Sequence, residues 1–289
     1  MENILEVSNL NKSYKNFSLS NVSFTLPKDC ITGFIGANGA GKTTTIRTIL
    51  GLAHKDSGTI SIFGKDMVKN EMEIKNRIGV VFDEGCFYDN LTMKEMKSII
   101  APAYSAWDDK TFANYMEKFS LNPNQKISTL SKGMRMKFSL ALALSHNAEL
   151  LIMDEPTSGL DPLVRSQLLD IMRDYMKEGG RSIFFSTHIT SDLDKVADML
   201  ILIDNGKIIF EEEKDALIER HHIVKGDKKA LSEENKNLFI EIEKTSFSFV
   251  GLTNKLDEVR KAIPDIVVER VSVEDIMLAY LKEEGYYEC

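Results

Sequence analysis

The sequence predicts an α/β protein with a mixed sheet core, antiparallel N-terminal strands and an inserted helical lobe, plus a small α+β C-terminal domain. Three observations predict it. Short alternating or apolar runs open the chain and recur between residues 149 and 213. A polar, helix-rich segment interrupts them at about residues 84–146. Beyond residue 220 the chain becomes charged and turn-rich, with strand-like and helical runs interspersed. We therefore expect a large domain over residues 1–220 and an appendix over residues 221–289.

The composition narrows the classes of function. A length of 289 residues accommodates one large α/β domain and a smaller one. The net charge of −8 argues against non-specific nucleic-acid binding, because phosphate backbones attract a basic surface. The longest apolar runs are far shorter than the roughly 20 residues of a membrane-spanning helix, so a membrane role requires a partner. Cys30, Cys86 and Cys289 lack metal-ligand spacing, which predicts reduced thiols of the cytosol.

The strongest motif is "GANGAGKTT", which lies between an expected strand and an expected helix and matches the phosphate-binding pattern G-x-x-x-x-G-K-[ST]. Its glycines let successive N–H groups point at phosphate oxygens, and the helix adds its positive end. Lys42 would contact the terminal phosphates and Thr43 would offer its hydroxyl to Mg²⁺. The expected large domain, residues 1–220, contains no guanine-reading Asn-Lys-x-Asp, which favours ATP. The predicted P-loop NTPase cradle comprises Gly36, Ala37, Asn38, Gly39, Ala40, Gly41, Lys42, Thr43 and Thr44.

A second motif, "LLIMDEPTSGLDP", places two acids at the end of an apolar strand. Asp154 would emerge at the sheet edge as a ligand of Mg²⁺, and Glu155 would polarise an attacking water as general base. His188 ends another strand, "SIFFSTH", at the same edge. A neutral imidazole there would bind the γ-phosphate or orient the water. The sequence thus predicts Glu155 and His188 as catalytic residues.

The order of the cradle, "LSKGM", "LLIMDEPTSGLDP" and "STH" resembles the ATP-binding subunit of an ABC transporter over about residues 1–215. The resemblance implies that two subunits close head to tail, with each ATP between one cradle and the other chain's "LSKGM". Ser131 and the N–H of Gly133 would then meet the γ-phosphate at a helix N-terminus. Tyr14 would stack on adenine, and Asp161 would reach across the dimer interface. An alternative for Ser131 is a plain helix N-cap.

The resemblance also implies partners and a location. ATP and Mg²⁺ would be the cofactors, a separate transmembrane permease the partner, and the dimer would form with a second copy or with another ATPase subunit. The protein would lie peripherally at the cytoplasmic face of the cell membrane and bind no nucleic acid. The sequence of the helical lobe is similar to that of ATPases from bacterial exporters for antibiotics and antimicrobial or cytotoxic peptides, such as phenol-soluble modulins.

The sequence departs from the family pattern at two places. The usual signature is Leu-Ser-Gly-Gly-Gln, and Lys132 and Met134 replace its third and fifth residues. Asp83 stands where the family has glutamine, or occasionally glutamate, which couples Mg²⁺ and water to the membrane partner. We expect Asp83 to hold Mg²⁺ through water. Phe87 and Tyr88 beside it form either a patch for a coupling helix of that partner or part of the core.

Two other readings stay open. One is a soluble, non-transport ABC-type ATPase of DNA repair or translation. The short interval between Lys42 and Ser131 leaves no room for the long coiled coil of the repair proteins, and translation factors usually carry two cassettes. The other is a regulatory module that acts through the C-terminal appendix. Asp83 is compatible with this interpretation, because a weakened ATP site would switch slowly.

Overall fold

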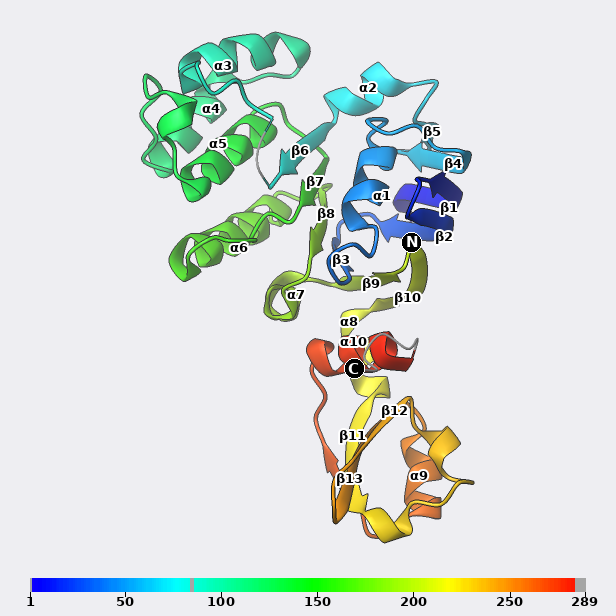
Figure 1. Cartoon of the computed structure of the whole chain (residues 1–289). Helices are drawn as coiled ribbons and strands as arrows, with labels where there is room; N and C mark the ends of the chain where they lie inside the picture. The colour runs from blue at the N-terminus through cyan, green and yellow to red at the C-terminus, as the bar shows by residue number, and fades with distance from the viewer. Residues whose placement is uncertain (1, 84–85, 284–289) are drawn as a thin grey trace.

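The computed structural model describes residues 2–83 and 86–283, in which two sheets form the main body (Figure 1). The larger has the strand order β10-β9-β3-β8-β7-β6 and is parallel except for β10. The smaller is antiparallel, with the order β2-β1-β4-β5. The strands are β1 (Asn3–Ser13), β2 (Ser18–Pro27), β3 (Ile31–Ile35), β4 (Ser57–Ile62), β5 (Lys65–Asp66), β6 (Ile78–Phe82), β7 (Leu150–Asp154), β8 (Ser182–Thr187), β9 (Met199–Asp204) and β10 (Lys207–Glu213). The predicted mixed sheet and antiparallel N-terminal strands are confirmed.

Both faces of the larger sheet are covered. Phe34 and Phe184 point into the core shared with the antiparallel sheet, where their ring centroids are 5.3 Å apart. Their neighbours Ile35 and Phe185 point into a second core beneath the helices. Because alternate side chains enter two different cores, these strands are continuous apolar runs, which is why their positions are legible in the sequence.

Four helices of the main body pack in two different places. α1 packs into the core of the antiparallel sheet, whereas α3, α4 and α5 gather in a helical lobe at one end of the molecule (Figure 1). The lobe begins with a capping box, in which Thr92 Oγ1 accepts the Glu95 N–H and Glu95 Oε2 accepts the Thr92 N–H. The helices are α1 (Lys42–Ile49), α2 (Glu71–Asn76), α3 (Met93–Ile100), α4 (Asp109–Lys118), α5 (Lys132–Leu144), α6 (Pro162–Met176), α7 (Thr190–Val196) and α8 (Lys214–Arg220).

A tight hairpin joins the last two strands of the larger sheet. Asn205 and Gly206 have φ of 43° and 71°, the left-handed values of a two-residue turn. β9 and β10 pair antiparallel on either side of it. An Asn-Gly pair between two apolar runs favours this type of turn, so the sequence itself accounts for the hairpin.

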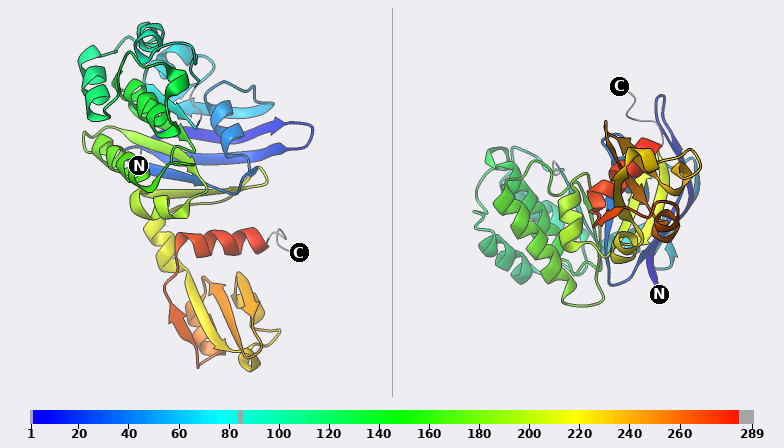
Figure 2. Two further views of the ribbon diagram at one scale, coloured as in Figure 1. Left: turned by 60° about the vertical axis from the view of Figure 1, so that its left-hand side comes forward. Right: turned by 90° about the horizontal axis from the view of Figure 1, so that it is seen from below.

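Beyond residue 221 a second antiparallel sheet, of order β12-β13-β11-β14, packs with α9 around its own small core (Figure 1). Its elements are β11 (His222–Asp227), β12 (Glu241–Lys244), β13 (Ser248–Thr253), α9 (Leu256–Ala262) and β14 (Val267–Glu269). The final helix α10 (Val273–Glu283) lies between this sheet and the main body (Figure 2).

α10 belongs to the main core. Ile276 and Ala279 are buried in the same cluster as Leu193 of α7. Tyr280 Oη lies 3.1 Å from Nε2 of His221, which links α10 to the residue that follows α8. Residues on both sides of position 220 therefore share one core, and the proposed domain division there stays a prediction. No helix in residues 2–83 and 86–283 combines the length and apolar character needed to span a bilayer.

Candidate functional site

The predicted cradle forms the turn between β3 and α1, with residues 36–41 in the turn and residues 42–44 opening the helix. Gly39 and Gly41 have φ of 86° and 115°, which side chains other than that of glycine rarely adopt. A Cβ on Gly36 would lie 2.3 Å from the carbonyl oxygen of Ile203 on β9. The glycines are thus required both by the curl of the loop and by its close approach to the neighbouring strand.

The structure brings Lys42 and both predicted catalytic residues together. The buried Lys42 ammonium donates to the carbonyl oxygens of Gly36 (2.7 Å) and Ala37 (3.1 Å) and lies 3.2 Å from Glu155 Oε1. Glu155 Oε2 lies 2.8 Å from His188 Nδ1. Glu155 has a φ of 50°, uncommon for a residue with a side chain, and this turn re-aims its carboxylate away from the strand direction. One carboxylate thus bridges the cradle lysine and the histidine.

Asp154 is held by a residue that the motifs do not predict. Ser186 Oγ donates to Asp154 Oδ1 at 2.6 Å and accepts the Glu155 N–H at 2.9 Å. The register explains it, since Asp154 pairs with Ser186 across β7 and β8. A signal was present in the sequence: Ser186 stands two residues before His188, at the end of a strand expected to reach the same sheet edge.

Two aromatic residues lie in the turn between β1 and β2. The predicted adenine-stacking residue Tyr14 is 52% exposed, and Lys12 Nζ is 5.1 Å from its ring centroid. Phe17 packs against the cradle, because a Cβ on Gly41 would lie 2.8 Å from Phe17 Cζ. Phe17 is a second aromatic candidate at the nucleotide, which sequence reasoning missed although it stands three positions after Tyr14.

The residues that are expected to face a second chain lie at the starts of α5 and α6. Ser131 is the N-cap of α5, and its Oγ accepts the Met134 N–H at 3.3 Å. Gly133 packs against Val164 of α6, where an added Cβ would lie 3.3 Å from Val164 Cγ1. Asp161 caps α6 by accepting the Val164 N–H at 3.0 Å. Gly133 thus brings the starts of the two helices into contact.

These residues form a group separate from the cradle. Among residues 2–83 and 86–283, no hydrogen bond or ion pair joins Ser131, Gly133 or Asp161 to Glu155. The contacts thus fall into two sets: one joins Lys42, the acid pair and the histidine, and the other lies at the starts of α5 and α6.

Asp83, predicted as a ligand of Mg²⁺, contacts the other departure from the family pattern. Its Oδ1 lies 2.5 Å from Lys132 Nζ, as an ion pair rather than an aligned hydrogen bond. Phe82, the last residue of β6, pairs in register with Asp154, so Asp83 follows β6 at the edge where β7 delivers Asp154. Thr43, the other predicted ligand, has no hydrogen-bond partner for its hydroxyl in the described part of the chain.

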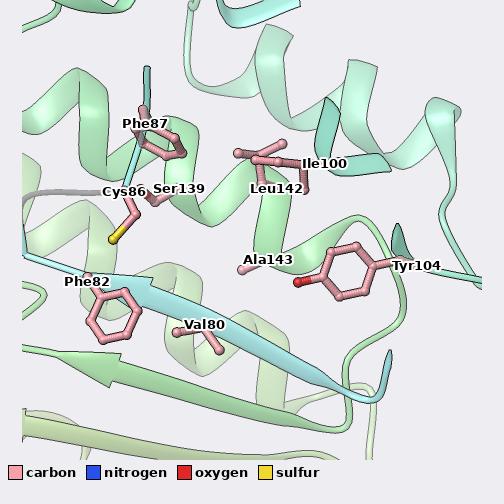
Figure 3. A pocket seen from close by; sticks show the side chains of 9 residues that line it. All are labelled: Val80, Phe82, Cys86, Phe87, Ile100, Tyr104, Ser139, Leu142 and Ala143. Atoms are coloured by element: carbon pink, nitrogen blue, oxygen red, sulfur yellow. The ribbon is translucent and has the colours of Figure 1, made fainter. Parts of the chain in front are cut away.

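An apolar pocket of about 180 Å³ lies between β6 and the helical lobe (Figure 3). Phe87 lines it, and its ring centroid is 5.0 Å from that of Phe138 on α5, so Phe87 belongs to the lobe core while Tyr88 is 65% exposed. At its far end Tyr104 stacks on His146, with ring centroids 3.8 Å apart. Burial raises the pKa of Tyr104 and lowers that of His146. The lining residues are Val80, Phe82, Cys86, Phe87, Ile100, Tyr104, Ser139, Leu142 and Ala143.

Comparison with known proteins agrees with this geometry. The sequence profile of the family described as "ABC transporter" matches residues 19–158. The chain is 36% identical over 239 residues to the bacitracin transport ATP-binding protein BcrA of Bacillus licheniformis, an alignment that covers 82% of this chain and 78% of that protein. It is 34% identical over 215 residues to the lantibiotic transport ATP-binding protein SrtF of Streptococcus pyogenes, covering 73% and 92% respectively.

Solved structures show the same fold. One, described as the ATP-binding subunit of an ABC transporter, superposes with a TM-score of 0.68 at 28% identity and covers 75% of this chain and 92% of that chain. Another, an ATP-binding cassette in a dimeric post-hydrolysis state with ADP and Pi, superposes with a TM-score of 0.65 at 21% identity and covers 72% and 98%. The second likeness concerns the fold alone.

The cradle and the acid pair define a P-loop ATPase. Within that class, the chain belongs to the family of ATP-binding subunits of ABC transporters. It therefore binds ATP and hydrolyses it. The resemblance and the fold class expected from the sequence are confirmed.

Proposed function

We propose that this chain is the ATP-hydrolysing subunit of an exporter for antibiotics or antimicrobial peptides, and that it works as a head-to-tail dimer on a separate permease. The observation that carries the catalytic part is the position of Glu155 between Lys42 and His188, at 3.2 and 2.8 Å. The names of the relatives, which concern bacitracin and lantibiotic transport, support the class of cargo.

The proposed hydrolysis uses the residues as they stand around the cradle. Lys42 binds the terminal phosphates, and the Glu155 carboxylate takes a proton from the water that attacks the γ-phosphorus. The bond from that phosphorus to the β–γ bridging oxygen breaks, which yields ADP and phosphate. His188 holds Glu155 Oε2, and Ser186 holds both Asp154 and the Glu155 backbone. General-base assistance of this kind is worth about 10²–10⁴-fold in rate.

Mg²⁺ fits the donor set. The Thr43 hydroxyl and the buried Asp154 carboxylate are hard oxygen ligands of the kind that this ion prefers. In residues 2–83 and 86–283 no group of three or more His, Cys, Asp or Glu could hold a metal by itself, which suits an ion that also binds substrate phosphates. Bound there, Mg²⁺ would neutralise phosphate charge. Asp83 is proposed as a water-mediated ligand, and its ion pair with Lys132 limits that role.

The two sets of contacts support the proposed dimer. Ser131 and Gly133 lie at the start of α5, and Asp161 lies at the start of α6. In a head-to-tail pair the helix starts of one chain face ATP in the cradle of the other, where the α5 N-terminus favours an anion. All the motifs of one composite site occur in this chain, so a homodimer is sufficient for two sites.

The permease would bring the protein to the cytoplasmic face of the membrane. We propose that one of its cytoplasmic segments docks at the apolar pocket between β6 and the helical lobe (Figure 3). β6 leads directly to Asp83, so a segment seated on that strand would contact the edge that carries Asp154. Phe87 supplies part of the apolar lining. Co-purification of a membrane protein that is lost on Phe87→Asp substitution would support this site.

The dimer is tested with the variant Glu155→Gln, which keeps the shape of the side chain and removes the base. With MgATP, light scattering after size exclusion is expected to give twice the monomer mass, and the double variant Lys42→Ala/Glu155→Gln should stay monomeric. The proposal fails if Glu155→Gln remains monomeric with saturating MgATP while the wild-type ATPase rate per molecule does not depend on protein concentration.

A further inference from the structure

We propose that Lys132 acts within its own chain, as a positioning residue paired with Asp83, and not on the ATP of the second chain. The inference deepens the proposed function and rests on it, because it concerns how the start of α5 is aimed. The primary observation is the 2.5 Å distance between Lys132 Nζ and Asp83 Oδ1. Their side chains are 39% and 34% exposed, so the contact is partly shielded from solvent.

The pair joins two parts of the molecule that carry different halves of the site. Lys132 is the first residue of α5 and stands between Ser131 and Gly133. Asp83 follows β6, whose last residue lies beside Asp154 in register. An attraction between Lys132 and Asp83 therefore holds the start of the lobe helix against the sheet edge that carries the acid pair.

A third segment takes part. Gly159 has a φ of 65°, and a Cβ added to it would lie 3.3 Å from Lys132 Nζ and 3.6 Å from Lys132 Cδ. The lysine side chain thus passes over the loop that leads to Asp161. Together with Gly133 against Val164, this contact fixes the start of α5 relative to the start of α6.

Two of the three residues that depart from the family pattern, Asp83 and Lys132, are then one feature. A charged carboxylate at the sheet edge is matched by an ammonium on the facing helix, and each substitution is accommodated because the other is present. With its charge engaged by Asp83, Lys132 adds no free cation to the anion-binding helix start. Ser131 and the backbone of Gly133 remain the groups that meet a phosphate.

A double-mutant cycle with neutral, similarly sized side chains tests the pairing. Asp83→Asn, Lys132→Gln and the double variant are compared in two ways: the urea midpoint of the chain without nucleotide, and kcat and KM for ATP. Each single change should lower kcat at unchanged KM, and the double variant should fall no further than either single one. The coupling expected for such a partly exposed pair is about 1.5- to 5-fold, and high salt should reduce it. Lys132→Arg should retain wild-type kcat.

The matched control is Arg135→Gln, which removes a different ion pair of the same helix, Arg135 with Asp89 at 2.6 Å. Its effect should add to that of Asp83→Asn. The proposal is overturned if Lys132→Gln raises KM for ATP by the same factor with and without Asp83→Asn, since Lys132 would then act on nucleotide. The urea measurement requires neither ATP nor a dimer, so it separates a failure of this pairing from a failure of the proposed dimer.

Discussion

The Nδ1 atom of His188 lies 2.8 Å from the Oε2 atom of Glu155, although 33 positions separate the two residues. The contact exists because β7 and β8 are parallel neighbours that end at one edge of the sheet. Lys42 approaches the other carboxylate oxygen from the cradle. The residue that we propose as general base is therefore fixed from both sides, and its removal can be measured separately from nucleotide binding.

We expect Glu155→Gln to reduce kcat for ATP hydrolysis by about 10²–10⁴-fold, because an amide cannot accept the proton of the attacking water. ATP binding should persist, since the cradle glycines and Lys42 are unchanged. Phosphate release under saturating MgATP measures the first effect, and equilibrium binding of a fluorescent ATP analogue measures the second. A variant that turns over at the wild-type rate would show that Glu155 is not the base.

Ser186→Ala should lower kcat by about 5- to 100-fold, which corresponds to the roughly 1–3 kcal/mol of a hydrogen bond removed from a buried charged partner. Asp154 Oδ1 loses its donor and the Glu155 N–H loses its acceptor. Ser182→Ala, on the same strand but at its other end, is the matched control. Equal rates for the two variants would remove Ser186 from the set of positioning residues.

Substitution of the two aromatic residues in the β1–β2 turn should affect the binding of ATP and of tripolyphosphate, which lacks the adenine ring, in different ways. Tyr14→Ala should weaken ATP binding by about 5- to 100-fold, the range of 1–3 kcal/mol for base stacking, without changing the binding of inorganic tripolyphosphate. Phe17→Ala should weaken both, since Phe17 packs on Gly41 of the cradle. Calorimetric titration with the two ligands compares them. If only Phe17→Ala discriminates ATP from tripolyphosphate, Phe17 is the stacking residue.

Stability should fall as the pH drops below about 6.5, the usual pKa of histidine. Burial lowers the pKa of His146 in the folded chain, so the unfolded chain binds its proton first and the stabilisation present above that pH is lost as the pH falls. The slope for one such group is at most about 1.4 kcal/mol per pH unit. Urea unfolding between pH 7.5 and 5 should show a shallower slope for His146→Gln.

The matched control for that measurement is His54→Gln, at an exposed position. His221, whose pKa burial also lowers, stays in both variants and contributes the slope that remains. Parallel lines for the wild type and His146→Gln would mean that His146 carries a proton in the folded chain. Such a result would be explained by the two carbonyl oxygens, of Ile78 and Leu142, that face its ring nitrogens, because both accept hydrogen bonds from a protonated ring.

The parts predictable from sequence were those with local causes. The left-handed backbone at Gly39 and Gly41 requires glycine, the Asn205–Gly206 pair specifies its turn, and strands buried on both faces are continuous apolar runs. Ser186 and Phe17 were not found, because their roles depend on strand register and on packing between distant segments.

The Asp83–Lys132 contact also depends on packing between distant segments and could not be predicted from the sequence. In the sequence each residue is a departure from the family pattern by itself: Asp83 as an expected water-mediated ligand of Mg²⁺, and Lys132 as a replacement within the signature. Only the packing of the lobe on the sheet places the two charges together, and that packing has no signature within either segment.

Because α10 packs beside α7, the last helix of the described residues completes a core that begins with the first half of the sequence. During synthesis the ribosome must release residues 197–283 before that surface of α7 is covered. The small sheet of β11 to β14 is made in the interval, around a core of its own. A nascent chain therefore exposes apolar residues of α7, which follows His188, until α10 has been made, and this part of the core should close only after the small sheet has formed.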